Sequence, residues 1–264
     1  MAKHAAVFGD VHGRFDLLQI LISRIRAKYD DIDIYSTGDL IDRGPASRGV
    51  IELCIKENVS AVMGNHESWL HQYLMYGQFD DFALHTIMGG IATLGSYGVT
   101  TLTTDAIERG LKAQMPNRHM QFILELPLWR TFEVGGETFR LSHAGLKNSD
   151  VEGLLEHDPS LGTPEMADLL MDLSRSLCHQ SILWAGFSAR QPNVYAFTDS
   201  SVQVFGHVPL WEPMIRPHFI GVDTGCGTRS PEKLSAVILP EREVISVDKA
   251  SEKITGPGFN DFTL

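Results

Sequence analysis

Three short apolar segments in the first 65 residues end in a glycine followed by an acid or an amide, about 25 to 30 residues apart. The segments 5–8, 32–36 and 61–63 are followed by Gly9-Asp10, Gly38-Asp39 and Gly64-Asn65. Apolar residues at helical spacing occupy the intervals, at about 15–29 and 50–55. This alternation predicts right-handed βαβ units and a largely parallel sheet, which binds ligands at the carboxyl ends of its strands.

The rest of the chain changes from a helical pattern to a strand pattern near Pro127. A helical region is predicted at about 68–126, and a hairpin of 128–134 and 138–142 around the turn Gly135-Gly136. Further helices are expected at 151–157 and 164–178, and strands at 202–205, 218–222, 234–239 and 243–247. We therefore expect one domain over 1–250 with a helical insert at about 68–126, and a C-terminal tail over 251–264.

Charge and cysteine content narrow the classes of function. The 22 basic and 33 acidic side chains give a net charge of −11, which argues against nonspecific binding to nucleic acids. Cys54, Cys178 and Cys226 are too widely spaced to indicate a disulfide framework or a thiolate zinc site. The sequence contains no pattern typical of a signal peptide or a membrane span, so we expect a cytoplasmic protein that does not bind a membrane. The oligomeric state stays open.

Five clusters of polar residues follow the predicted strands. They lie at 9–13, 38–44, 64–67, 142–145 and 206–207, and they contain Asp10, His12, Asp39, Asn65, His143 and His207. One such cluster is typical of a turn or a helix cap, but five at one sheet edge would bury acids and imidazoles at a cost unless something neutralises them. Oxygen and imidazole donors without thiolates suit manganese, iron or zinc. Two carboxylates and four neutral donors would leave a pair of divalent ions with a net positive charge, which attracts phosphate.

In this order, the motifs resemble those of the PPP family of calcineurin-like metallophosphatases, which contains serine/threonine protein phosphatases and their bacterial relatives. The resemblance extends from Gly9 to about Asp223 and implies a four-layer α/β/β/α sandwich. It also implies two divalent metals as cofactors, with manganese expected first and iron or zinc as alternatives. Of the implied ligands, the first metal would take Asp10, His12 and Asp39, and the second Asp39, Asn65, His143 and His207.

The resemblance also assigns roles around the phosphoryl group. Arg43 and Asn65 would contact the phosphoryl oxygens. His66, supported by Asp42, would protonate the leaving oxygen while a hydroxide that bridges the metals attacks in line. We therefore expect Asp42, Arg43 and His66 to be the catalytic side chains.

The sequence departs from the family pattern at one place. Many members carry a second phosphate-binding arginine shortly after a tryptophan, whereas Trp184 is followed here by alanine and glycine. Arg190 is the candidate substitute. Two other acids have structural interpretations: Glu67 as a hydrogen-bond acceptor behind the metal ligands, and Asp223, in the turn Asp223-Thr224-Gly225, as part of the fold near the site.

Three functions compete at this stage. The first is hydrolysis of phosphoserine or phosphothreonine in proteins. The second is hydrolysis of diadenosine polyphosphates or other small phosphoesters, but the symmetrical diadenosine tetraphosphatases typically lack an acid at the position of Asp42 and have aspartate at that of Glu67. These two residues favour the protein phosphatase. The third, a non-catalytic module that keeps its metals for structure, is disfavoured because the ligand set is complete.

Overall fold

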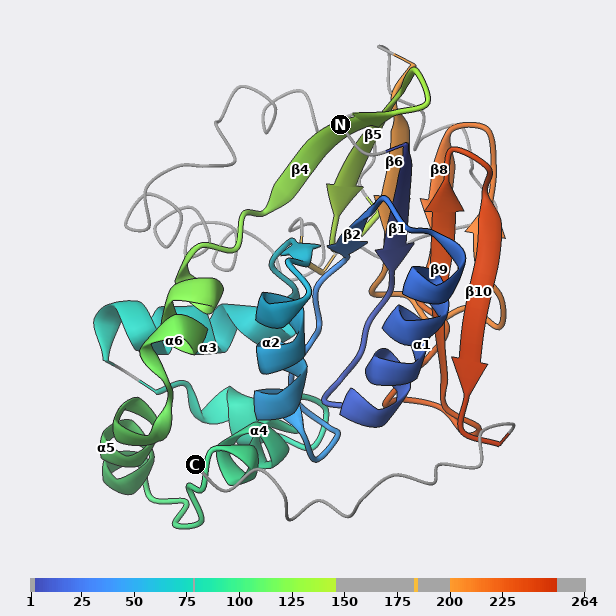
Figure 1. The fold of residues 1–264 in the computed structure, drawn as a ribbon. Coiled ribbons are helices and arrows are strands. Elements are labelled where there is room, and N and C mark those ends of the chain that lie inside the picture. The colour runs from blue at the N-terminus through green and yellow to red at the C-terminus, as the bar shows by residue number, and fades with distance from the viewer. Residues whose placement is uncertain (1–2, 78, 146–182, 185–199, 251–264) are drawn as a thin grey trace.

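The computed structural model describes residues 3–77, 79–145, 183–184 and 200–250, and it contains two five-stranded sheets (Figure 1). The first sheet has the order β10 (Glu243–Asp248), β9 (Lys233–Leu239), β1 (His4–Phe8), β2 (Ile32–Ser36) and β3 (Ser60–Ala61). The strands β1, β2 and β3 are parallel, as predicted, whereas β9 and β10 are antiparallel additions. The carboxyl ends of the first three strands therefore lie at one edge.

The second sheet contributes further strand ends to the same region. Its order is β4 (Trp129–Val134), β5 (Glu137–Ser142), β6 (Val202–Phe205), β8 (Phe219–Gly221) and β7 (Met214–Ile215). The predicted hairpin is β4 and β5, and the two glycines of its turn have φ values of 59° and 79°, which suit glycine. The strand β7 has only two residues, too few for a periodic sequence pattern, and the analysis above missed it.

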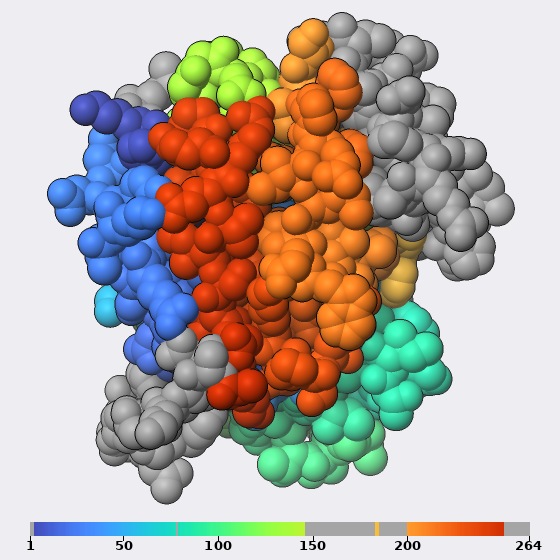
Figure 2. Space-filling model, turned by 90° about the vertical axis from the view of Figure 1, so that its right-hand side faces the viewer, coloured from blue at the N-terminus to red at the C-terminus, as the bar shows by residue number. Residues whose placement is uncertain are grey.

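The strand alternation of β1 separates two buried layers. Val7 packs with Leu141 and Val204 of the second sheet, whereas Phe8 packs with residues of α1 (Phe15–Lys28) and α2 (Ser47–Lys56). In Figure 2 the red strands β9 and β10 lie between the blue helix α1 and the orange residues of the second sheet. The fold is thus the expected α/β sandwich, and the helices predicted at 151–157 and 164–178 fall outside the described residues.

The region predicted as helical packs beside α2 (Figure 1). It contains α3 (Asn65–Tyr76), the 3-10 helix η1 (Asp81–Leu84), α4 (Gly90–Ser96), α5 (Thr104–Gln114) and α6 (Asn117–Leu124). The helix α3 begins three residues before the predicted region, because the Glu67 carboxylate accepts a hydrogen bond from the N–H of Gly64 and closes a capping box. Within the described part of the chain, no helix has the length and apolar character needed to cross a membrane.

Candidate metal centre

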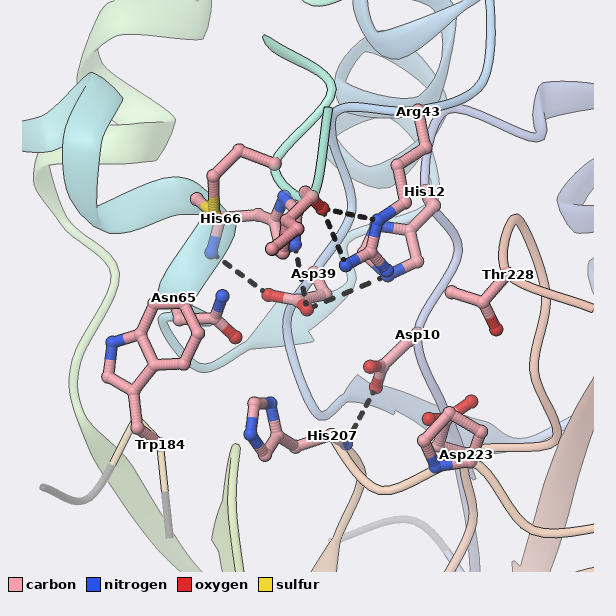
Figure 3. Close-up of a pocket in the computed structure, with 13 residues that line it drawn as sticks. Asp10, His12, Asp39, Arg43, Asn65, His66, Trp184, His207, Asp223 and Thr228 are labelled. Atoms are coloured by element: carbon pink, nitrogen blue, oxygen red, sulfur yellow. Dashed lines mark hydrogen bonds and ion pairs between the residues drawn. The ribbon is translucent and has the colours of Figure 1, made fainter. Parts of the chain in front are cut away.

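Strand ends from both sheets meet at one pocket (Figure 3). Asp10 follows β1, Asp39 follows β2, Asn65 follows β3 and His207 follows β6. The full lining is Asp10, His12, Asp39, Arg43, Asn65, His66, Ile87, Met88, Trp184, His207, Pro209, Asp223 and Thr228. The topology therefore brings the predicted site residues together from positions more than 190 residues apart.

Two clusters of donor atoms share the carboxylate of Asp39. His12, Asp39 and His66 form the first cluster, and Asp39, His143 and His207 form the second, with the donor atoms of each cluster within 4.8 Å of one another. Asp39 is the residue that was expected to bridge two metals. His66 was predicted to be a proton donor, and its position in the first cluster places it beside the metal ligands.

Asp10 and Asn65 complete the predicted ligand set. Asp10 Oδ1 accepts hydrogen bonds from Thr37 Oγ1 at 3.3 Å and from the backbone N–H of His207 at 3.2 Å. Asn65 Oδ1 lies 2.9 Å from His143 Nε2. All six predicted ligands are thus gathered in one region, although their coordination of a metal stays a prediction.

The hydrogen bonds of His143 show that the donors fit a cation. Its Nδ1–H donates to the carbonyl oxygen of Thr37 at 2.8 Å, so a neutral ring has only a lone pair at Nε2. That lone pair faces Asn65 Oδ1 at 2.9 Å and Asp39 Oδ1 at 3.4 Å. His12 repeats the arrangement, since Nδ1–H donates to the Ile41 carbonyl and leaves Nε2 free to coordinate. Convergent lone pairs without a proton between them repel one another, and a divalent ion would remove that repulsion.

Burial shifts the protonation of these groups in the direction that a metal would correct. Burial, followed by the negative charges of Asp223 and Asp39, raises the pKa of Asp10 well above its usual value. Burial and the charge of Glu67 raise the pKa of Asp39 in the same way. Burial lowers the pKa of His207 to about 4, so this imidazole is neutral and able to coordinate. Carboxylates that are costly to ionise and imidazoles that stay neutral suit manganese, iron or zinc.

The backbone around the donors is held in conformations that most residues avoid. Asp39, Asp42 and Arg43 have φ values of 50°, 70° and 63°. Positive φ in residues other than glycine costs energy and is retained where the surroundings enforce it, often at functional sites. The buried carboxylate of Glu67 supplies part of this support, because it accepts hydrogen bonds from the N–H groups of Gly64, Asp39, Leu40 and Ile41. Glu67 is therefore a supporting acceptor, as its position in the sequence suggested.

His66 and Asp42 form a buried pair at the pocket wall. His66 Nδ1 donates to Asp42 Oδ2 at 2.8 Å, and Trp69 Nε1 donates to the same oxygen at 2.9 Å. The other oxygen of Asp42 accepts from Thr93 Oγ1 at 2.6 Å. His66 Nε2 has no hydrogen-bond partner among the described residues and belongs to a side chain that lines the pocket. The ring is thus fixed with one nitrogen directed at the reaction site.

Arg43 lines the opposite side of the pocket (Figure 3). Its Nε and Nη2 donate to the carbonyl oxygen of Ile87 at 3.2 and 3.1 Å, and Nη1 donates to His12 Nε2. A guanidinium has five N–H donors, so these three bonds leave two. Arg190, the predicted second phosphate-binding arginine, lies outside the described residues.

Four lining residues have no role in the sequence-based prediction. Asp223 follows the short strand β8, the same pattern that identified the other acids, and burial raises its pKa to about 6. Trp184, noted only for the missing arginine, lines the pocket with its ring edge-on to His207 at 5.8 Å between centroids. Ile87 and Met88 lie in a loop of the helical region, where no sequence signal distinguished them.

Comparison with known proteins agrees with this geometry. The family model for calcineurin-like phosphoesterases matches residues 3–211. The chain is 25% identical over 253 residues to the asymmetrical bis(5'-nucleosyl)-tetraphosphatase PrpE of Halalkalibacterium halodurans, a match that covers 91% of this chain and 92% of the relative. It is 42% identical over 65 residues to serine/threonine-protein phosphatase 1 of Salmonella typhimurium, which covers 25% of this chain and 30% of the relative.

Solved structures support the fold. The crystal structure of a putative diadenosine tetraphosphatase superposes with a TM-score of 0.58 at 19% identity, covering 94% of both chains. A cold-active protein-tyrosine phosphatase from a Shewanella species superposes with a TM-score of 0.55 at 16% identity, covering 93% of this chain and 78% of the other. At such identities the likeness concerns the fold alone. The match to the family model extends over most of the sequence, and the chain belongs to the calcineurin-like phosphoesterase family, which implies a metal-dependent phosphoester hydrolase.

Proposed function

We propose that this chain hydrolyses phosphoserine or phosphothreonine in proteins as a metal-dependent phosphomonoesterase. The observation that carries the proposal is the buried pair of His66 and Asp42. A serine or threonine alkoxide is a poor leaving group, so its departure requires a proton that an oriented imidazole can supply. His66 Nε2 faces the pocket 3.8 Å from Asp39 Oδ2, next to the predicted metal ligands.

The remaining side chains of the site bind and orient the substrate. Two divalent ions, for which we expect manganese, would activate water and neutralise the phosphoryl charge when held by the six predicted ligands. Arg43 has two N–H donors left for the phosphoryl oxygens, and Asn65 is the second predicted contact. Asp42 keeps the Nδ1 proton of His66 in place, so the proton for the leaving oxygen is held at Nε2.

A dinucleoside polyphosphate is the second candidate substrate. The relatives named asymmetrical bis(5'-nucleosyl)-tetraphosphatase match 91% and 98% of this chain, whereas the serine/threonine phosphatase from Salmonella matches 25% of it. This coverage favours the dinucleotide. The His66–Asp42 pair favours the phosphomonoester, because a nucleotide leaves as a weak base and gains little from a general acid.

The deciding experiment compares two substrates on the manganese-loaded protein. We would measure kcat/KM for a phosphothreonine peptide and for diadenosine tetraphosphate, with Asp10→Asn as the inactive reference. We expect the peptide to be preferred by at least about tenfold, the difference made by a modest change in transition-state stabilisation.

Each alternative has a distinct result. Preference for the dinucleotide would replace the proposed substrate with the second candidate. Folded protein that hydrolyses neither substrate, nor an aryl phosphate, with manganese, iron or zinc would replace both with the non-catalytic binding module.

A further inference from the structure

Gly89, the residue that precedes α4, lies directly against the backbone of Arg43. Its φ is 73°, a conformation that favours glycine. A Cβ atom at this position would lie 2.9 Å from Arg43 N and 3.0 Å from both Arg43 Cα and Cγ. Carbon atoms in van der Waals contact are about 3.5 to 4.0 Å apart, so a methyl group here would displace Arg43.

The same loop holds Arg43 by hydrogen bonds. The backbone N–H of Arg43 donates to the carbonyl oxygen of Gly89 at 3.1 Å. Its guanidinium donates twice to the carbonyl oxygen of Ile87, and Figure 3 shows the guanidinium held between this oxygen and the ring of His12. One short loop therefore fixes both the backbone and the charged end of Arg43.

This support matters because Arg43 does not hold its own conformation. Its φ of 63° is unfavourable for a residue with a side chain, and so is the φ of 70° at Asp42. The supporting loop is itself closed by two hydrogen bonds, in which His85 O accepts from the N–H groups of Met88 and Gly89 at 2.9 Å each. The Ile87 side chain is 59% exposed, so the loop is held by its backbone and not by a buried side chain.

We propose that Gly89 is a positioning residue, which sets the place of the Arg43 guanidinium in the pocket and thereby the affinity for the phosphoryl group. The contact links the helical region to the site without any side chain of Gly89. This inference rests on the proposed function, in which Arg43 contacts the phosphoryl oxygens. It concerns a residue whose sequence signal was only that of a helix break.

Gly77 provides a matched control. It has φ 75° and ψ 5°, close to the φ 73° and ψ 22° of Gly89, and no atom lies within 4 Å of the place of its Cβ. Alanine at either position therefore brings a similar backbone cost, but only at Gly89 does the methyl group meet Arg43. The comparison of Gly89→Ala with Gly77→Ala isolates that contact.

The readout is the dissociation constant of inorganic phosphate, measured by titration calorimetry on manganese-loaded protein. We expect Gly89→Ala to weaken phosphate binding by about tenfold or more, as expected when a hydrogen bond to a charged group is lost, and Gly77→Ala by less than about twofold. In an Arg43→Ala background, Gly89→Ala should have no further effect, because the residue through which it acts is gone. Circular dichroism and thermal unfolding check that each variant is folded.

Several results would overturn the proposal. These are equal phosphate affinities of Gly89→Ala and Gly77→Ala, additive effects of Gly89→Ala and Arg43→Ala, or no phosphate binding by the wild-type protein. If Gly89→Ala does not fold, Gly89→Asn and Gly77→Asn replace the alanine pair, since asparagine adopts positive φ more readily and still carries a Cβ. If the wild-type protein hydrolyses no phosphoester, the proposed function fails, and the phosphate affinities still decide the role of Gly89.

Discussion

At the scale of single residues, protonation and hydrogen-bond direction limit what each side chain in the pocket can do. The Nδ1–H of His143 is directed at the Thr37 carbonyl, which leaves Nε2 for a cation. The Nδ1–H of His66 is directed at a carboxylate instead, and no second imidazole or amide faces its Nε2 within hydrogen-bond distance in the described structure. Two histidines with similar burial thus suit different tasks, coordination in one case and proton transfer in the other.

The role of His66 predicts a dependence on the leaving group. We expect His66→Asn to lower kcat on a phosphothreonine peptide by about 10² to 10⁴, the range for loss of general acid catalysis. On an aryl phosphate the loss should be much smaller, because a phenolate leaves without a proton. Steady-state kinetics of both substrates on wild type and variant measure the ratio. Equal losses on the two substrates would contradict proton donation by His66.

At the scale of elements, the sequence predicted what periodicity and strand ends record. The segment 32–36 was predicted as a strand and is β2 with the same bounds, and Asp39 after it reaches the site. The strand β3 is shorter than predicted, because the N–H of Met63 bonds to Pro127 O outside the sheet. The contacts of Gly89 and Thr93 with the loop that carries Asp42 and Arg43 could not be predicted, since they depend on how distant segments pack.

Thr93 in α4 connects the helical region to Asp42. Its Oγ1 accepts a hydrogen bond from the backbone N–H of Asp42 at 2.9 Å and donates to Asp42 Oδ1 at 2.6 Å. We expect Thr93→Val to lower the free energy of unfolding by about 1 to 3 kcal/mol, the cost of leaving buried polar groups without partners. Urea unfolding measures this loss. Thr93→Ser keeps the hydroxyl and should retain most of the stability, and the exposed Thr101→Val should change little.

The same Thr93→Val variant should also show a change in kinetics. A carboxylate that has lost one fixed partner holds His66 less firmly, so hydrolysis of the alkyl phosphoester should fall more than hydrolysis of an aryl phosphate. A stable Thr93→Val protein with unchanged kinetics on both substrates would show that the hydroxyl does not position Asp42.

His71 in α3 predicts a loss of stability in acid. Burial lowers its pKa to about 4, below the value of about 6.5 for an exposed histidine. As the pH falls from 6.5 towards 4, the unfolded chain takes up a proton that the folded chain does not, so stability decreases. Between pH 7 and 5 we expect this residue to cost about 2 kcal/mol, from 1.36 kcal/mol for each pKa unit. Urea unfolding of His71→Leu at both pH values should show a smaller decrease than wild type, and an equal decrease would contradict the assignment.

At the scale of the whole molecule, the site joins the two sheets. Asp39 follows β2 of the first sheet, whereas His143 and His207 follow β5 and β6 of the second. Between the sheets lies an apolar layer that includes Val7 and Val204. Polar donors with convergent lone pairs thus meet at the edge of this layer, where burial makes their mutual repulsion costly. A cation bound at this edge would link the sheets, so metal binding and global stability should be coupled.

Removal of the metal should therefore destabilise the fold, and Asp39 should carry most of the effect because both donor clusters share it. Manganese at about 100 times its dissociation constant should raise the free energy of unfolding by about 2.7 kcal/mol, or the melting temperature by about 5 to 10 °C, relative to protein in chelator. Asp39→Asn keeps an oxygen for the N–H of His66 but removes the buried charge, so in chelator it should melt at or above the wild-type temperature, and manganese should raise it by less than about 2 °C. Asp33→Asn, an exposed position on the same strand, should keep the full manganese response in scanning calorimetry. A full response in Asp39→Asn would mean that the metal is held elsewhere, and that the lone pairs converging on this carboxylate do not form its site.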